Sequence, residues 1–122
     1  MFELEKYPGS SELYDFDFTG VLAANEVLVS VDSVGALPVL AGADALTFGS
    51  KTINVAPVTY PDGVVAGIGK VVQVRVNGGT AETGQPKRNY SITITCTTSS
   101  GSTTVVKADM AVLTLSPLNN LI

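Results

Sequence analysis

The feature that most constrains the fold of this chain is the alternation of polar and apolar residues between positions 89 and 102. The segment reads Asn-Tyr-Ser-Ile-Thr-Ile-Thr-Cys-Thr-Thr-Ser-Ser-Gly-Ser. Its apolar positions recur at every second residue: Tyr90, Ile92, Ile94 and Cys96. Because successive side chains of a strand point to opposite faces of a sheet, this period predicts a half-buried strand that enters a hairpin at the Ser/Gly cluster.

Five further segments show a similar period and are expected to be strands. They are residues 12–18, 26–32, 51–58, 71–77 and 103–115. The side chains expected to share one strand face are, in chain order, Tyr14, Phe16 and Phe18; Val27, Val29 and Val31; Ile53 and Val55; Val72, Val74 and Val76; and Val106, Ala108 and Met110. Strands of this length joined by turns, without a convincing long helix, predict an all-β sandwich or barrel.

The turns between these segments have recognisable chemistry. Tyr60-Pro-Asp-Gly63 and Asn77-Gly-Gly79 predict tight turns, because Pro presets φ and Gly accepts positive φ. Residues 33–50 are rich in Gly, Ala and Leu and only weakly periodic. That segment is expected to hold either a short strand near residues 45–48 or an irregular crossover.

Composition sets the size of the domain and excludes several kinds of partner. A chain of 122 residues makes one domain, and its net charge of −4 with scattered basic residues argues against nucleic acid. Only 15% of the residues are charged, below the roughly 25% that is usual, which indicates a surface rich in small polar or apolar groups. No apolar run is long enough for a membrane span, and the first residues lack a signal-peptide pattern. These features predict a protein made in the cytoplasm that contacts other proteins.

The penultimate expected strand favours an immunoglobulin-like antiparallel sandwich. Tyr90 opens it after a polar loop, which resembles the tyrosine-corner strand of immunoglobulin and fibronectin type III domains. The chain has one cysteine and no Trp, so an antibody-type domain is not expected, and Cys96 is interpreted as a small core residue. We expect an N-terminal arm at residues 1–11, a β-sandwich domain at residues 12–115 and a C-terminal tail at residues 116–122.

Three segments, taken in order, resemble a family of short structural proteins of tailed bacteriophages. These are Tyr-Asp-Phe-Asp-Phe-Thr-Gly-Val-Leu at residues 14–22, followed by Glu-Val-Leu at residues 26–28; the strand and Gly-Gly-Thr turn at residues 72–80; and Thr-Thr-Ser-Ser-Gly at residues 97–101, preceded by Tyr90 at the start of its strand. Members of that family are described as tail-fibre adaptor, neck or head-tail connector components with an immunoglobulin-like fold. The resemblance implies a virion location and contacts with other virion proteins, and it supplies no ligand residue.

Residues that carry enzyme or metal chemistry are sparse. The chain has no His, which removes the commonest general base and a common metal ligand. Asp15 and Asp17 share a strand face and would bind Ca²⁺ only with oxygens from further loops, so they are interpreted as solvated charges. Tyr7, Tyr14 and Tyr60 would suit a sugar-binding platform only if their rings lay together and exposed. We therefore expect no catalytic residue, no metal site and no cofactor.

The function expected from these observations is binding to other proteins of a particle. The candidate interface residues are the apolar and aromatic ones near the two chain ends: Met1, Phe2, Tyr7, Leu121 and Ile122. They would lie on a neighbouring copy or another virion protein, or they would cover the core of their own chain. An assembly adaptor at the neck or tail, repeated as a homo-oligomer, is the first hypothesis. Capsid decoration on the head, or a carbohydrate-binding or adhesion module, are the alternatives.

Overall fold

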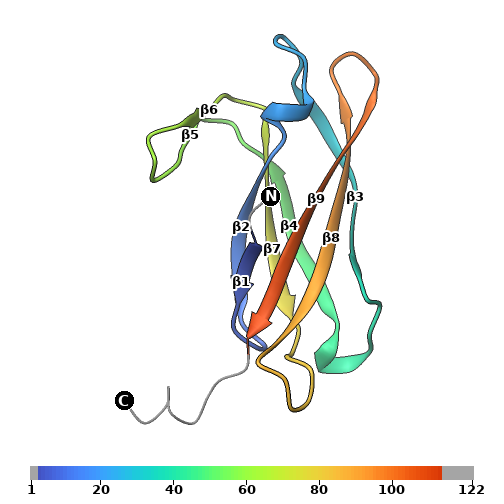
Figure 1. The fold of residues 1–122 in the computed structure, drawn as a ribbon. Coiled ribbons are helices and arrows are strands. Elements are labelled where there is room, and N and C mark those ends of the chain that lie inside the picture. Colours follow the sequence, from blue (N-terminus) through green and yellow to red (C-terminus); the bar gives the residue numbers. More distant parts are fainter. Residues whose placement is uncertain (1–2, 114–122) are drawn as a thin grey trace.

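Two β-sheets packed face to face make up most of the computed structural model, which describes residues 3–113 (Figure 1). The strands are β1 (Glu3–Lys6), β2 (Ser11–Asp17), β3 (Leu28–Leu37), β4 (Leu46–Ile53), β5 (Val58–Thr59), β6 (Val65–Ala66), β7 (Val71–Gly78), β8 (Lys87–Thr98) and β9 (Thr103–Leu113). Short 3₁₀ helices occur at Thr19–Val21 and Gly42–Asp44. One sheet has the order β1-β9-β8-β3 and the other β2-β7-β4, while β5 and β6 pair only with each other.

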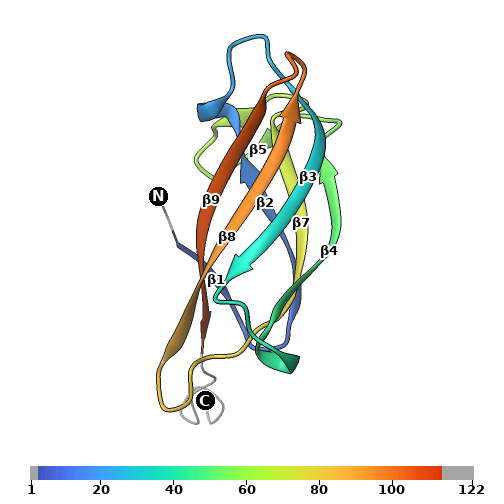
Figure 2. The same cartoon turned by 90° about the vertical axis from the view of Figure 1, so that its right-hand side faces the viewer.

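The strand order confirms the predicted immunoglobulin-like sandwich. In that fold, strands B, E and D share one sheet and strands C, F and G share the other. Here β2-β7-β4 and β3-β8-β9 correspond to those two sets, and their pairings are antiparallel. The first strand lies at the β9 edge, where β1 runs parallel to β9. Figure 2 shows the long strands of the two sheets crossing as they twist.

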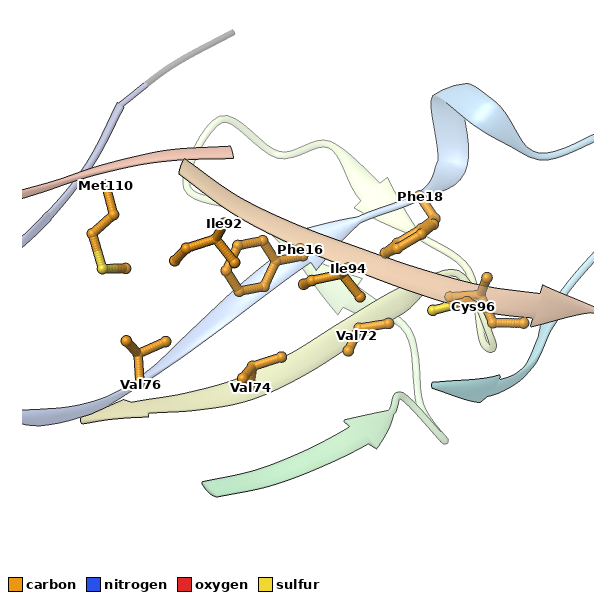
Figure 3. Packing of buried hydrophobic residues seen from close by; sticks show 10 residues of the cluster. Phe16, Phe18, Val72, Val74, Val76, Ile92, Ile94, Cys96 and Met110 are labelled. Carbon is orange, nitrogen blue, oxygen red and sulfur yellow. The ribbon is translucent and has the colours of Figure 1, made fainter. Parts of the chain in front are cut away.

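The core lies between the sheets and is built from the alternating residues of β2, β7, β8 and β9. Figure 3 shows these side chains pointing toward one another from both layers. The cluster consists of Phe16, Phe18, Leu28, Val72, Val74, Val76, Ile92, Ile94, Cys96 and Met110, all buried. The predicted inward faces of residues 72–76 and 90–96 are therefore confirmed, and Tyr14, Val106 and Ala108 pack against the cluster as partly buried residues.

Two predicted strand faces were wrong at one residue each, Val29 and Val55, whereas Val31 and Ile53 pack against the core as predicted. In β3 the structure buries Leu28 and exposes Val29, the reverse of the expected alternation. Register shifts between Leu28 and Ser30 and between Val31 and Ser33 break the period, since each bulge adds a residue and changes which face follows. Val55 was expected to point inward with Ile53, yet it lies beyond the end of β4 and is 89% exposed.

Within the expected N-terminal arm, residues 3–6 form β1, which pairs with β9 of the sandwich. Lys6 in this strand is buried, and its Nζ donates to the Gly78 carbonyl at 2.6 Å and to the Tyr7 carbonyl and Ser10 Oγ at 3.2 Å each. Burial lowers the pKa of Lys6, and the negative charge of Glu12 opposes that shift. Three hydrogen bonds make the burial of this ammonium group tolerable and hold β1 in place.

The hydroxyl group of Tyr90 is hydrogen-bonded to two segments that connect the sheets, the one between β3 and β4 and the one between β7 and β8. The hydroxyl donates to the carbonyl oxygen of Asp44 at 2.5 Å and accepts from the N–H of Thr80 at 3.3 Å. The predicted tyrosine thus stands near the start of the strand that corresponds to F. Its main partner, however, is the distant 3₁₀ helix Gly42–Asp44 rather than backbone a few residues upstream.

Cys96 makes stability depend on pH in the alkaline range. Burial, and next the charge of Asp32, raise the pKa of its thiol from the ordinary 9.0 to about 11. The folded state therefore holds this proton more tightly, and its contribution is complete below pH 9.0 and is lost as the pH rises towards about 11. We expect urea denaturation to show a loss of about 2 kcal/mol over this window.

The control for that prediction is Cys96→Ala, measured over the same pH series. The variant is less stable at neutral pH because it leaves a small cavity, but its stability should decline less between pH 9.0 and about 11. The tyrosines contribute to the alkaline decline in both proteins, so the difference between the two curves isolates the thiol. Parallel curves would show that the thiolate is not disfavoured in the core.

Candidate interaction surfaces

The most prominent surface feature is an insertion between β4 and β7, formed by residues 54–69. Figure 1 shows it projecting from the side of the sandwich, with β5 and β6 as a short hairpin at its end. The hairpin turn is the predicted Tyr60-Pro-Asp-Gly63 turn, in which Gly63 has a φ of 87° and donates its N–H to the Tyr60 carbonyl at 2.9 Å. We call this segment the insertion.

Asn54 closes the base of the insertion with its side chain. The Nδ2 atom donates to the carbonyl oxygens of Ala56 and Gly67, at 2.9 Å each. The Oδ1 atom accepts from the backbone N–H groups of Lys70 and Val71, at 3.0 Å each. One carboxamide therefore fixes both ends of the insertion onto the start of β7, because it uses donors and acceptors at the same time.

The insertion exposes a group of large apolar side chains. Val55 is 89% exposed, and Val64, Val65 and Ile68 are each more than half exposed. Single apolar residues on a surface are common, but four on one projecting segment make the insertion a candidate interaction surface. None of these four residues was predicted to lie at an interface, and Val55 was predicted to face the core. The available signal was a Val-rich segment between Pro57 and Gly69 whose period matches neither a strand nor a helix.

A groove of about 690 Å³ lies beside the insertion, between the edges of the two sheets. Its apolar lining comes from Leu4 of β1, Phe16 of β2, and Val106 and Ala108 of β9. Its remaining lining residues include Tyr60, Asp15, Asp17, Asp62 and Lys107. The groove thus combines an apolar interior with three carboxylates and one ammonium group.

Tyr60 connects the insertion to the sandwich at this groove. Its hydroxyl donates to Asp17 Oδ2 at 3.1 Å. Burial, and next the negative charge of Asp17, raise the pKa of Tyr60 to about 12. The phenol therefore stays protonated at neutral pH and keeps donating to the carboxylate, which fixes the tip of the insertion against β2.

Of the candidate interface residues, the structure describes only Tyr7. Tyr7 is 56% exposed and lies in the turn between β1 and β2, where its carbonyl oxygen accepts from Lys6. Met1, Phe2, Leu121 and Ile122 lie outside the described residues, as does the predicted tail at residues 116–122.

The acidic residues considered for metal binding have local roles. Asp17 Oδ1 accepts from the N–H of Thr19 at 2.8 Å and from its Oγ1 at 2.6 Å, so it caps the turn after β2. Asp15 accepts from Gln73 Nε2 across the β2–β7 pair at 3.1 Å. Among residues 3–113, no group of three or more Asp, Glu, Cys or His side chains is placed to hold a metal ion.

The three tyrosines considered for sugar binding differ in their exposure. The hydroxyl of Tyr14 donates to the Glu5 carbonyl at 2.8 Å, and the ring packs on the core. Tyr60 is held by Asp17. Of the three, only Tyr7 is mostly exposed, so the structure does not bring them together as one exposed platform.

The structure is therefore an immunoglobulin-like β-sandwich with a projecting apolar insertion and a groove between the edges of its two sheets. No helix in the described part of the chain is both long and apolar enough to cross a membrane. Comparison with models of protein families and with curated proteins finds no match to the chain.

Proposed function

We propose that this chain is a non-enzymatic structural protein of a tailed-bacteriophage virion. In this role it is an assembly adaptor at the neck or tail, repeated as a homo-oligomer, that holds fibres or connector proteins through protein–protein contacts. The location follows from the resemblance of residues 14–22, 72–80 and 97–101 to such proteins. The observation that supports binding as its activity is the set of exposed apolar side chains on the insertion.

The arrangement of the insertion suits an assembly contact. The sandwich is held by long antiparallel pairings, and Asn54 and Tyr60 fix the insertion to it at its base and at its tip. The apolar side chains are therefore presented in a fixed place before binding, which lowers the entropy lost when the partner docks. On a symmetric particle, many such contacts add to a strong assembly even if each one is weak.

Serine substitutions on the insertion test this proposal. The variant carries Val55→Ser, Val64→Ser, Val65→Ser and Ile68→Ser. We expect its copy number in density-purified particles, measured by quantitative mass spectrometry, to fall at least about tenfold, since four apolar side chains would no longer be buried in the contact. The particles are produced in cells that express the chain with its natural neighbours.

The matched control places serines on exposed apolar residues far from the insertion. Leu37 is 64% exposed and Val39 is 82% exposed, at the end of β3 and in the loop after it. The variant Leu37→Ser/Val39→Ser should enter particles like the unmodified chain, and circular dichroism should show both variants folded. Equal loss in both variants would contradict a specific role of the insertion.

The copy number of the unmodified chain tests the location independently. A few copies for every hundred major capsid subunits would support the neck or tail, and near-equal numbers would replace the adaptor role by capsid decoration. Absence of the chain from particles would overturn the virion proposal.

A further inference from the structure

Half of the outer edge of β9 is unpaired within the described residues. β1 pairs with β9 only from Asp109 to Val112, and no described strand lies beside residues 103–108. Figure 1 shows β1 alongside only the C-terminal half of β9. The backbone N–H and C=O groups along an unpaired edge form a template for another strand. A segment of about six residues, roughly 20 Å long, would match this length of edge.

The groove lies directly beside this edge and has an apolar interior. Val106 and Ala108 of the unpaired part of β9 face it, and Leu4 and Phe16 line it from β1 and β2. A strand that paired with this part of β9 would direct every second side chain into the groove. Apolar side chains at those positions would fill a space of about 690 Å³ that the described residues leave open.

The charges around the groove favour a cationic side chain among those that enter it. Asp15, Asp17 and Asp62 are lining residues, against the single ammonium group of Lys107. The hydrogen bonds recorded for these carboxylates come from neutral donors, such as Gln73 Nε2 to Asp15 and the Val64 N–H to Asp62. Their negative charge is therefore available to a cationic partner.

We infer that this groove binds an extended segment of a partner protein that adds a strand to β9 beside residues 103–108. Of the side chains that enter the groove, apolar ones pack against Leu4 and Phe16, and a Lys or Arg side chain approaches Asp15, Asp17 and Asp62. This surface is separate from the apolar side chains of the insertion. The inference goes beyond the proposed function, because it holds for any partner with such a segment.

A titration of the isolated full chain with two synthetic peptides tests the inference. The first peptide is acetyl-Val-Thr-Lys-Thr-Val-Thr-amide, whose odd-numbered side chains enter the groove, and the second has Glu in place of the Lys. In ¹⁵N-edited NMR spectra, the Lys peptide should shift the amide signals of residues 103–108 and 15–17, and the Glu peptide should bind at least about tenfold more weakly. The assay needs no particle, so its failure is distinguishable from failure of the virion proposal.

Two variants with matched controls locate the binding. Ala108→Phe fills the groove and should abolish the chemical-shift changes. Val105→Phe introduces the same aromatic side chain on the same strand, but Val105 does not line the groove, so this variant should retain binding. Asp15→Asn/Asp62→Asn keeps the hydrogen-bond acceptors but removes two charges. This double variant should bind the Lys peptide about fivefold more weakly. Its binding of the neutral peptide acetyl-Val-Thr-Val-Thr-Val-Thr-amide should be unchanged.

Four results would overturn the inference. They are shifts confined to β3 and β4, equal binding of the Lys and Glu peptides, full binding by Ala108→Phe, and no binding at millimolar peptide. A fifth result identifies a different occupant. If the peptide binds only after deletion of Met1 and Phe2, the groove belongs to the start of the same chain and not to a partner.

Discussion

Replacement of Ile94 by alanine should lower the free energy of unfolding by about 3 kcal/mol, measured by urea denaturation. Ile94 is fully buried on β8, an inner strand of its sheet, and its side chain points at β2 and β7 of the other sheet (Figure 3). The expected loss combines the apolar area no longer buried with a cavity that neighbouring strands cannot close. Close packing between the two sheets makes that cavity costly.

Two controls separate the effect of packing from effects on the strand. Ile94→Val removes one methylene carbon from the same position and should cost about 1 kcal/mol. Thr93→Ala changes the adjacent residue, which points to the opposite face of the sheet and is half-buried, and should cost much less than Ile94→Ala. An alanine variant as stable as the valine variant would mean that the interface between the sheets is loosely packed.

Much of the fold could be predicted because β7 and β8 are inner strands with one buried face. Where a face is buried, a slip of one residue would move every apolar side chain into water, so the sequence must keep a strict period of two. This constraint explains the clear alternation of residues 72–76 and 90–96. It does not act on the edge strand β3, where bulges change the face between residues 28 and 33.

The candidate surfaces were harder to predict, for a different reason in each case. In the insertion, Val55 follows Ile53 at the two-residue spacing of a strand face and so resembles a core residue. The strand, however, ends at Ile53. The groove is lined by β1, β2, β9 and the insertion, whose lining residues are separated by tens of positions in the chain. A local sequence pattern carries no information on such a site. Only the order of strands in the sheets brings the edges of β2 and β9 together.

Replacement of Asn54 by aspartate should lower the free energy of unfolding by about 3 kcal/mol at neutral pH. Aspartate keeps the acceptor for the N–H groups of Lys70 and Val71, but it replaces the Nδ2 donor by a negatively charged oxygen. The carbonyl oxygens of Ala56 and Gly67 would then face this oxygen at the present distance of 2.9 Å. Two hydrogen bonds become two repulsive contacts.

Amide hydrogen exchange and urea denaturation, both as a function of pH, should show where and why Asn54→Asp acts. Exchange of the Lys70 and Val71 amides should become faster, because the variant weakens the base of the insertion. Part of the lost stability should return as the pH falls towards about 4, because the two carbonyl oxygens raise the pKa of the new carboxyl group and its protonated form can donate one hydrogen bond again. Asn89→Asp makes the same chemical change at an exposed position of β8 and should have little effect. If both variants were equally stable, Asn54 would not hold the insertion, and the exposed apolar side chains would lack the fixed placement that the assembly contact requires.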